Sequence, residues 1–489
     1  MNVYMTAHDD RYRAAFAGLA ARAAGEFPDV RLRVLFARPA PERSEAPHEH
    51  YLLPRDFPTK LEQVQDLAAL HARLARFGGR VPLDLFRSDM RLVLRERTAD
   101  MLAMEQAALS EALEALFAEA PPDLFFASSG TNIVHSVGYH LASAAGAKAY
   151  RIHSYLNLNL NHEGQRVWFC ANNRMSLSES PEDRFDYDPA AVEARIRALH
   201  DAVRSRAFKL DDISKRYRQR RMPVTPRQLA RDVGRLAWFA SPIHPRGSLA
   251  RLKANPHRDR LRVLANGRRN RRLTLPPGEL SERFVLFALN TPYDSQILVR
   301  APEYRDFLSL VELVAGLTPY GYDLVLREHP AFLGMLDHAR LAALQTRHPH
   351  VKLVSSDAPF PAIVAKARAV LIINNTAFVD AILAGKPVIS LANGYFQGRG
   401  LTREIGHLQE LRQAFDELVR GDLDGDRTEA LARAMSDLFQ ETWPGPDVRA
   451  DDKQTMIMDG VMAKLRRIAA VHGGLDAFCR RLRCGGEAP

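Results

Sequence analysis

The sequence predicts an α/β protein with two domains, each built on a parallel sheet, and a basic helical segment that joins them. Three observations support this prediction. The chain has 489 residues, about three times the length of a typical domain. Apolar runs of strand length alternate with segments of helical periodicity in both halves. Polar turns follow several of the apolar runs directly, as in sheets that bind ligands at the carboxyl ends of their strands.

The N-terminal half opens with a strand–helix–strand pattern. The elements that we expect are strands at 3–6, 30–36, 123–127 and 146–152, and helices at 12–24, 59–76, 88–118 (with a break) and 133–145. The polar turn 128–132 follows the strand at 123–127. We therefore expect Thr131, Asn132 and His135, with the loop 153–162, to lie on the acceptor side of a site.

The C-terminal half shows the α/β alternation more clearly. We expect strands at 284–289, 323–327, 351–354, 369–373 and 387–390, and helices at 304–317, 336–346, 361–367 and 377–384. Helices at 408–440 and 451–470 follow, and we expect the tail after Gly473 to be frayed. The predicted division is an N-terminal domain at 1–186, a basic linker or insertion at 187–275, a C-terminal domain at 276–450 and a terminal helix and tail at 451–489.

The positive charge of the chain is concentrated in one segment. The formal net charge is +10, but residues 204–272 contain 21 Lys and Arg against four Asp, a net charge of +17, which leaves −7 for the rest. Few aromatic residues accompany these basic residues, so we do not expect a nucleic-acid partner. Two interpretations stay open for residues 204–272: a solvated helical face, or contact with the anionic inner membrane surface or a lipid-linked acidic acceptor.

The three cysteines are too few for a disulfide framework in a chain of this size. The N-terminus has no basic region followed by an apolar run, and no stretch reaches the length of a membrane span. We therefore expect a cytoplasmic protein, peripheral on the membrane if the basic segment binds there.

Polar side chains follow four strands of the C-terminal half, where a parallel sheet would bring them to one edge. We expect Arg327 and His329 to form charged hydrogen bonds with a donor phosphate. Thr376 begins the helix at 377–384, whose free N–H groups also attract phosphate. Asp380 lies one turn into this helix and is placed to accept hydrogen bonds from a ribose.

Catalytic candidates lie along the same edge. Asp294, in the loop after the strand at 284–289, is the candidate nucleophile or general base. His329 is the second catalytic candidate, beside the leaving phosphate. The remaining donor-binding candidates are Asn290, Ser355 and Ser356. We expect no bound metal, because a basic side chain and a helix N-terminus can stabilise a departing phosphate.

Five short motifs carry a family resemblance. They are Leu-Asn-x-x-x-Asp at 289–294, Leu-Arg-Glu-His-Pro at 326–330, Ser-Ser-Asp at 355–357, Asn-Asn-Thr-x-x-x-Asp at 374–380 and Gly-Lys-Pro-Val-Ile at 385–389. In this order they resemble the bacterial capsule polysaccharide biosynthesis proteins, which include the retaining β-Kdo glycosyltransferases of GT-B fold. The resemblance covers about residues 283–400.

The resemblance implies a GT-B-like fold, in which two Rossmann-like domains face a cleft and the C-terminal one holds a nucleotide sugar, commonly CMP-linked. It implies a metal-independent glycosyltransferase with no cofactor beyond this donor, which acts on a capsule or lipopolysaccharide-type glycan. Two alternatives stay open. One is a CDP-polyol phosphotransferase of teichoic-acid type, and the other is a non-catalytic glycan- or lipid-binding component of capsule assembly.

Overall fold

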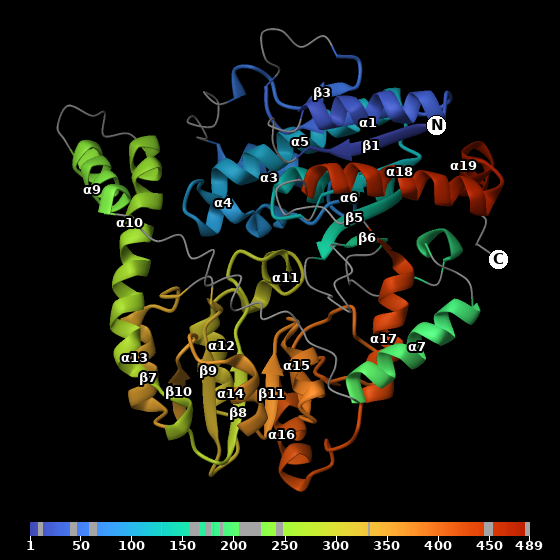
Figure 1. Ribbon diagram of the computed structural model, residues 1–489. Helices are drawn as coiled ribbons and strands as arrows, with labels where there is room; N and C mark the ends of the chain where they lie inside the picture. The colour runs from blue at the N-terminus through green and yellow to red at the C-terminus, as the bar shows by residue number, and fades with distance from the viewer. Residues whose placement is uncertain are drawn as a thin grey trace. The chain divides into compact units, whose positions relative to one another are not determined.

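The computed structural model describes residues 1–7, 13–39, 46–57, 66–128, 130–155, 166–171, 178, 180–185, 189–204, 226–240, 248–330, 333–444 and 453–484 (Figure 1). The chain divides into two compact units. Unit 1 comprises Met1–Val192 and Asp437–Pro489, and unit 2 comprises Glu193–Ser436. Each unit contains a largely parallel sheet with helices, so the predicted α/β class is confirmed.

The described strands of unit 1 form one sheet in the order β14-β6-β5-β4-β1-β2-β3. Their bounds are β1 Asn2–Thr6, β2 Arg31–Phe36, β3 Glu49–Tyr51, β4 Leu124–Ala127, β5 Lys148–Tyr155, β6 Arg166–Cys170 and β14 Thr442–Pro444. β1 to β5 pair in parallel, whereas β6 pairs antiparallel with both β5 and β14. The parallel part matches the strand–helix–strand pattern predicted from the sequence.

The helices of unit 1 come from both ends of the chain. They are α1 Arg13–Glu26, α3 Leu67–Ala75, α4 Met90–Val93, α5 Ala99–Glu119, α6 Ile133–Ala144, α18 Lys453–His472 and α19 Leu475–Arg483, with α7 Pro189–Arg204 at the boundary. α1 and α18 contribute buried side chains to one core with β1 and β2. The predicted break in the helix at 88–118 is real, since residues 94–98 separate α4 from α5.

The C-terminal segment differs from the prediction. We expected 451–489 to stand apart and the tail after Gly473 to be frayed. Instead Val461 and Leu465 of α18 lie in the core of unit 1. The end of the predicted C-terminal domain at 276–450 also groups with unit 1 from Asp437 onward, and β14 extends the sheet of that unit. α19 is ordered because it buries Phe478 and Cys479. An amphipathic helix is stabilised when its apolar face packs on apolar surface elsewhere in the fold. The local sequence predicts the apolar face but not the surface on which it packs.

The described strands of unit 2 form an entirely parallel sheet in the order β13-β12-β11-β8-β9-β10-β7. Their bounds are β7 Thr274–Leu275, β8 Phe284–Ala288, β9 Asp323–Arg327, β10 Val351–Val354, β11 Ala369–Ile372, β12 Val388–Ser390 and β13 Arg403–Glu404. β8 lies in the middle of this sheet, and β9 and β11 flank it. The strand order reverses at β8, which is the position where open parallel sheets bind ligands.

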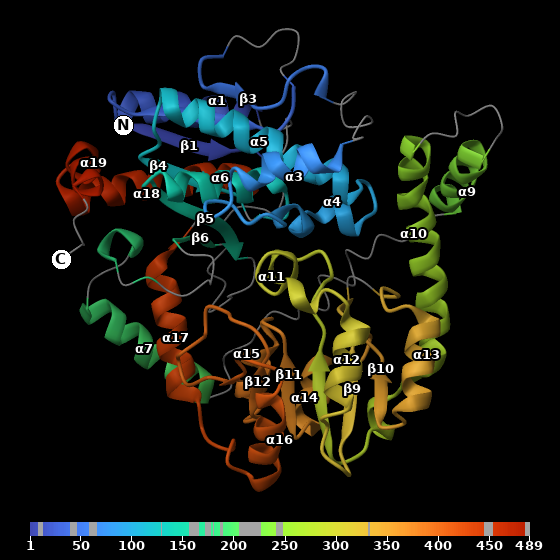
Figure 2. The same cartoon turned by 180° about the vertical axis from the view of Figure 1, so that it is seen from behind.

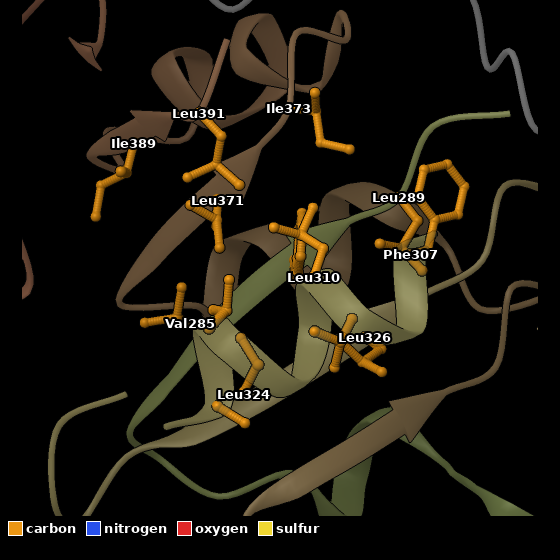
Figure 3. Close-up of a cluster of buried hydrophobic side chains, with 14 of the residues drawn as sticks. Val285, Leu289, Phe307, Leu310, Leu324, Leu326, Leu371, Ile373, Ile389 and Leu391 are labelled. Atoms are coloured by element: carbon orange, nitrogen blue, oxygen red, sulfur yellow. The ribbon is translucent and has the colours of Figure 1, made fainter. Parts of the chain in front are cut away.

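Helices surround the sheet of unit 2 and extend beyond it. They are α9 Pro226–Ala240, α10 Ser248–Asn270, α11 Ser295–Leu298, α12 Phe307–Ala315, α13 His338–Arg347, α14 Phe360–Lys366, α15 Ala377–Leu383, α16 Glu410–Arg420 and α17 Thr428–Glu441, whose last turn passes into unit 1. One core cluster joins the sheet to α12, α13 and α16. Figure 3 shows part of it, with Val285, Leu324 and Leu371 from three neighbouring strands gathered with Leu310 of α12.

The described C-terminal part of the basic segment, α10 and β7, is built into unit 2 and is not a separate linker. We expected 187–275 to form an independent segment, but α10 packs on α13, and β7 pairs with β10. The side-chain amide of Asn270 at the end of α10 donates to the Leu336 carbonyl at 3.0 Å. Residues 205–225 and 241–247 of the segment lie outside the described residues.

Two further observations concern the described part of the chain. No helix in it is both long and apolar enough to cross a bilayer. It also contains no group of three or more His, Cys, Asp or Glu side chains arranged to hold a metal ion.

Candidate functional site at the carboxyl edge of the unit 2 sheet

The parallel register of unit 2 brings several predicted site residues to one edge. Ala288, the last residue of β8, pairs with Arg327 on β9 and with Ile372 on β11. The loops that begin at 289, 328 and 373 therefore leave the sheet next to one another. These loops carry Asn290, His329 and Thr376.

Three asparagines join the loop after β8 to the loop after β11. The Asn290 side-chain amide donates to Oδ1 of Asn374 at 3.1 Å, and Asn290 Oδ1 accepts from the Asn375 amide at 3.0 Å. The Asn375 amide also donates to the Ala288 carbonyl at 2.7 Å. Asn290 is buried, and its side-chain amide holds the loop after β8 against the loop after β11.

Arg327 is also built into the fold. Its Nη2 donates to the carbonyls of Ser356 at 3.2 Å and Ala358 at 3.4 Å, and its guanidinium lies 4.7 Å from the ring centre of Phe360. These contacts hold the loop after β10 against the end of β9. A buried guanidinium keeps its charge, so Arg327 makes this edge electropositive.

His329 does not carry the positive charge that we expect from the sequence. Burial, assisted by the positive charge of Arg327, lowers its pKa to about 4. The imidazole is therefore neutral near pH 7 and offers a neutral hydrogen bond. His329 and Asn290 line the same small pocket, a cavity of about 10 Å³ bounded also by Glu328 and Leu336. That space holds about one water molecule.

Glu328, which is not among the site residues predicted from the sequence, is a buried acid that lines this pocket. Its Oε1 accepts from the backbone N–H groups of Gly334 at 3.2 Å and Leu336 at 3.1 Å. Burial raises its pKa to about 7, although these backbone donors counteract part of the rise. Glu328 thus orders the turn 333–337, against which α10 packs. The sequence signal that points to Glu328 is its position directly after a buried strand, between the site residues Arg327 and His329.

The residues at the start of α15 lie where the sequence placed them. Thr376 is the N-cap residue and is exposed, but its side chain makes no capping hydrogen bond. Asn375 takes that role, with Oδ1 accepting from the Ala377 N–H at 3.1 Å. The Thr376 hydroxyl thus has no capping task in the fold. Asp380 lies one turn into the helix and is half-buried.

Two serines follow β10. Ser355 is half-buried, and its Oγ accepts from the Asp357 N–H at 3.2 Å. Ser356 is buried, and its hydroxyl donates to the Glu328 carbonyl at 2.8 Å. Ser356 therefore contributes to the framework of the edge, while Ser355 lies nearer to its surface.

Asp294 is the N-cap of α11. Its Oδ1 accepts from the Gln296 N–H at 3.1 Å and from the Ser295 hydroxyl at 3.4 Å. The carboxylate is half-buried. Both hydrogen bonds use Oδ1, so a capping role and an action of Oδ2 on a substrate are geometrically compatible.

The acceptor-side candidates of unit 1 have structural partners. Asn132 caps α6, with its side chain accepting from the Val134 N–H at 3.2 Å, and the Thr131 carbonyl accepts from the Met90 N–H at 2.9 Å. His135 is 1% exposed, and its Nδ1 lies 2.6 Å from Oγ1 of Thr6. His135 is thus a core side chain in unit 1. Ser129 and residues 156–162 of the predicted loop 153–162 lie outside the described residues.

Comparison with known families confirms the predicted resemblance for the part of the chain that carries this edge. Residues 251–432 match the model of the family described as capsule polysaccharide biosynthesis protein. That range contains α10 from Arg251 onward and all seven described strands of the unit 2 sheet.

Two curated relatives match shorter stretches. Protein FixF of Sinorhizobium fredii is 26% identical over 152 residues, 31% of this chain and 36% of FixF. The capsule polysaccharide export protein KpsS of Escherichia coli is 30% identical over 142 residues, 28% of this chain and 36% of KpsS. The matched stretch thus spans little more than a third of each relative.

Among solved structures, the KpsC beta Kdo 2,7 transferase of Thermosulfurimonas dismutans aligns with 66% of this chain and 80% of its own. The alignment has a TM-score of 0.31 and 15% identity. A likeness of this degree carries no argument about activity.

Proposed function

We propose that the protein is a glycosyltransferase that moves a sugar from a nucleotide donor to a capsule or lipopolysaccharide-type glycan. One observation carries the proposal: Asn290, Arg327 and His329 meet at the carboxyl edge of a fully parallel sheet, beside its topological switch point. This edge lies within the segment that matches the capsule biosynthesis family. We favour a CMP-linked donor, as the resemblance implies.

In this proposal the donor phosphate binds over the ends of β9 and β11. Arg327 supplies the positive charge, neutral His329 donates a hydrogen bond, and the hydroxyl of Thr376 donates a second one. Asp380 accepts from the ribose, and Ser355 lies on the same side of the sheet. Asn290 and Ser356 hold the loops that carry these groups. The departing phosphate is stabilised by groups already in place, with no metal required.

Asp294 is the proposed catalytic carboxylate. Its Oδ2 either attacks the anomeric carbon while the bond to the leaving phosphate breaks, or takes the proton of the acceptor hydroxyl as that oxygen attacks. The first route ends with retention after a second displacement, and the second with inversion. In both, the nucleoside monophosphate leaves with the electron pair of the bond between its phosphate oxygen and the anomeric carbon.

Substitution of Asp294 by Asn tests the catalytic assignment. The variant would keep the Oδ1 cap and lose the negative charge, so we expect transfer to fall at least about 100-fold with an unchanged melting temperature. A matched control is Asp66→Asn, at the N-cap of α3 in unit 1, where Oδ1 accepts from the Ala69 N–H at 2.8 Å. Full transfer activity in a correctly folded Asp294→Asn protein would show that another group performs the chemistry.

A thermal-shift screen with CMP, CDP, UDP and GDP tests the donor. A ligand at 100 times its Kd stabilises the native state by about 2.7 kcal/mol, which is readily measured. We expect CMP to stabilise the protein most, and Arg327→Met to abolish the shift. Stabilisation by UDP or GDP alone would exclude the CMP-linked donor.

Product analysis separates the remaining interpretations. A glycosidic bond in the product supports the proposal, and a phosphodiester bond formed from a CDP-linked polyol would replace it by the phosphotransferase. Glycan binding with neither donor hydrolysis nor transfer would indicate a non-catalytic component. Loss of transfer on addition of EDTA would contradict the metal-independent mechanism.

A further inference from the structure

α9 is an amphipathic helix of unit 2, with one face packed on α10 and the other exposed. It lies alongside α10 in both views, and the contacts between the two helices are extensive (Figures 1 and 2). The proposed sugar transfer gives α9 no task. Its described side chains nevertheless form two distinct exposed stripes.

A buried ion pair fixes the rotation of α9 about its own axis. Asp232 is fully buried, and its Oδ1 lies 2.6 Å from Nδ1 of His257 on α10. Arg260 Nη1 donates to both oxygens of Asp232 at 3.2 Å. Because one carboxylate of α9 is tied to two side chains of α10, the opposite side of α9 is directed to solvent.

The first stripe on that exposed side is apolar. Leu229 is 39% exposed and Val233 is 53% exposed, and they lie four residues apart on one face. Ala230 and Ala237 are exposed beside them. An exposed apolar stripe of this kind costs free energy in water, since its apolar surface is stabilised only when it is removed from water. The stripe therefore favours a partner with an apolar layer.

The second stripe is basic and lies on the helix face next to the first. Arg227, Arg231 and Arg235 recur every four residues, and all three are exposed. Trp238 lies on the same side and is 60% exposed. Tryptophan and arginine are both suited to the boundary between an apolar layer and water, because each combines an apolar body with a polar end.

We propose that α9 docks unit 2 on an anionic lipid bilayer. An interfacial helix has low overall hydrophobicity, a marked apolar face and Lys or Arg on the polar face, and it lies in the plane of the headgroups. Leu229 and Val233 enter the boundary between headgroups and acyl chains, and the three arginines meet lipid phosphates. Nucleic acid would match the arginines but leave the apolar stripe in water. This inference stands independently of the sugar-transfer proposal.

Co-sedimentation of the full chain with lipid vesicles tests the proposal. We expect binding to vesicles of phosphatidylglycerol and phosphatidylethanolamine at low salt, little binding to pure phosphatidylcholine, and weaker binding as NaCl screens the charges. Absence of binding to the anionic vesicles at low salt would overturn the proposal, whether or not the protein transfers sugar.

Two pairs of variants assign the binding to α9. Arg231→Gln should lower the partition coefficient about fivefold, since each basic residue near the surface contributes about 1 kcal/mol. The control Arg412→Gln changes an exposed arginine of α16 and should have no effect.

The second pair tests the apolar stripe. Val233→Glu should lower binding at least tenfold, whereas Val419→Glu on α16 should not lower it. Val419 is a suitable control because it is 51% exposed, close to the exposure of Val233. Equal losses in a variant and its control would exclude α9 as the docking element.

Tryptophan fluorescence separates insertion from charge attraction alone. Trp168 is fully buried and Trp443 half-buried in unit 1, while Trp238 is exposed, so vesicles should shift mainly the emission of Trp238 to shorter wavelength. Trp238→Phe should remove the shift while co-sedimentation continues. Binding that falls with Arg231→Gln, but not with Val233→Glu, and that shows no shift would overturn insertion and indicate a general affinity for polyanions, including nucleic acid.

Discussion

The Asn290 amide donates to Oδ1 of Asn374 at 3.1 Å and so joins the loops that follow β8 and β11. These loops are 84 residues apart in the sequence and carry separate parts of the proposed donor site. Since the hydrogen bond is buried, it fixes their relative position without access to water.

Asn290→Ala should destabilise the protein and weaken nucleotide binding together. The substitution removes a hydrogen-bond partner from the buried side chain of Asn374 and from the half-buried side chain of Asn375, at a cost of about 1–3 kcal/mol. Denaturant unfolding gives this loss directly. Gln413→Ala removes an exposed hydrogen bond to Glu417 and should change stability by less than about 0.5 kcal/mol. A loss no greater than that control would mean that the asparagine network does not support the edge.

Glu328 should make stability fall as the pH rises. Its pKa is about 7 in the folded protein against an ordinary value of 4.5, so the folded state binds the extra proton between these values. The contribution of protonated Glu328 to the free energy of unfolding is fully present below pH 4.5. It is lost as the pH rises through 7, by about 3 kcal/mol in total. Burial of the carboxylate is the cause, because ionisation in a poorly solvated site is unfavourable.

Glu328→Gln is the test, since Gln can still accept from Gly334 and Leu336 through Oε1. We expect the variant to gain stability over the natural protein between pH 5 and pH 8, measured by denaturant unfolding at each pH. Glu441 in unit 1, whose pKa burial raises to about 8, is present in both proteins, so its effect cancels in the difference. A difference that is constant with pH would refute the elevated pKa of Glu328.

Gly334→Ala should separate α10 from the turn that Glu328 orders. Gly334 has φ of +86°, and a Cβ there would lie 2.6 Å from the backbone nitrogen of Gly267 on α10. Gly421 has the same φ of +86°, but a Cβ there would have its nearest neighbour, Asp424, at 3.5 Å. Both substitutions carry backbone strain, and only the first adds a collision. We expect Gly334→Ala to cost about 1–3 kcal/mol more than Gly421→Ala in thermal or denaturant unfolding. Equal costs would show that α10 yields easily at this point.

Lys464→Met should strongly destabilise unit 1. The Lys464 ammonium is fully buried, lies 2.6 Å from Oδ1 of Asp183 and sits 4.5 Å from the ring centre of Tyr150. Its removal leaves the Asp183 carboxylate buried without this cation, at a cost of about 3–5 kcal/mol. Arg466→Met, two residues along α18, breaks an exposed pair with Glu26 and should cost less than about 1 kcal/mol. Similar losses for the two variants would show that the buried pair adds no special stability.

The positions of the candidate site residues followed from the sequence because strand ends are local features. Short apolar runs located β8 to β12, and the polar residues directly after them could be assigned to one edge once the strands were taken as parallel. The protonation states and hydrogen-bond partners of these side chains could not be predicted from the sequence. The neutral form of His329 and the raised pKa of Glu328 depend on burial, and the capping of α15 by Asn375 rather than Thr376 depends on loop geometry.

The sequence by itself determined the α/β class, the order of the elements and the concentration of basic charge in one segment, because periodicity and composition are properties of short stretches. Only the tertiary structure decided that α18 and α19 complete unit 1, that α10 belongs to unit 2, and which stripes of α9 remain exposed. Those outcomes depend on pairings such as Asp232 with His257 and Lys464 with Asp183. Such pairings join residues that are distant in sequence, and no local pattern specifies them.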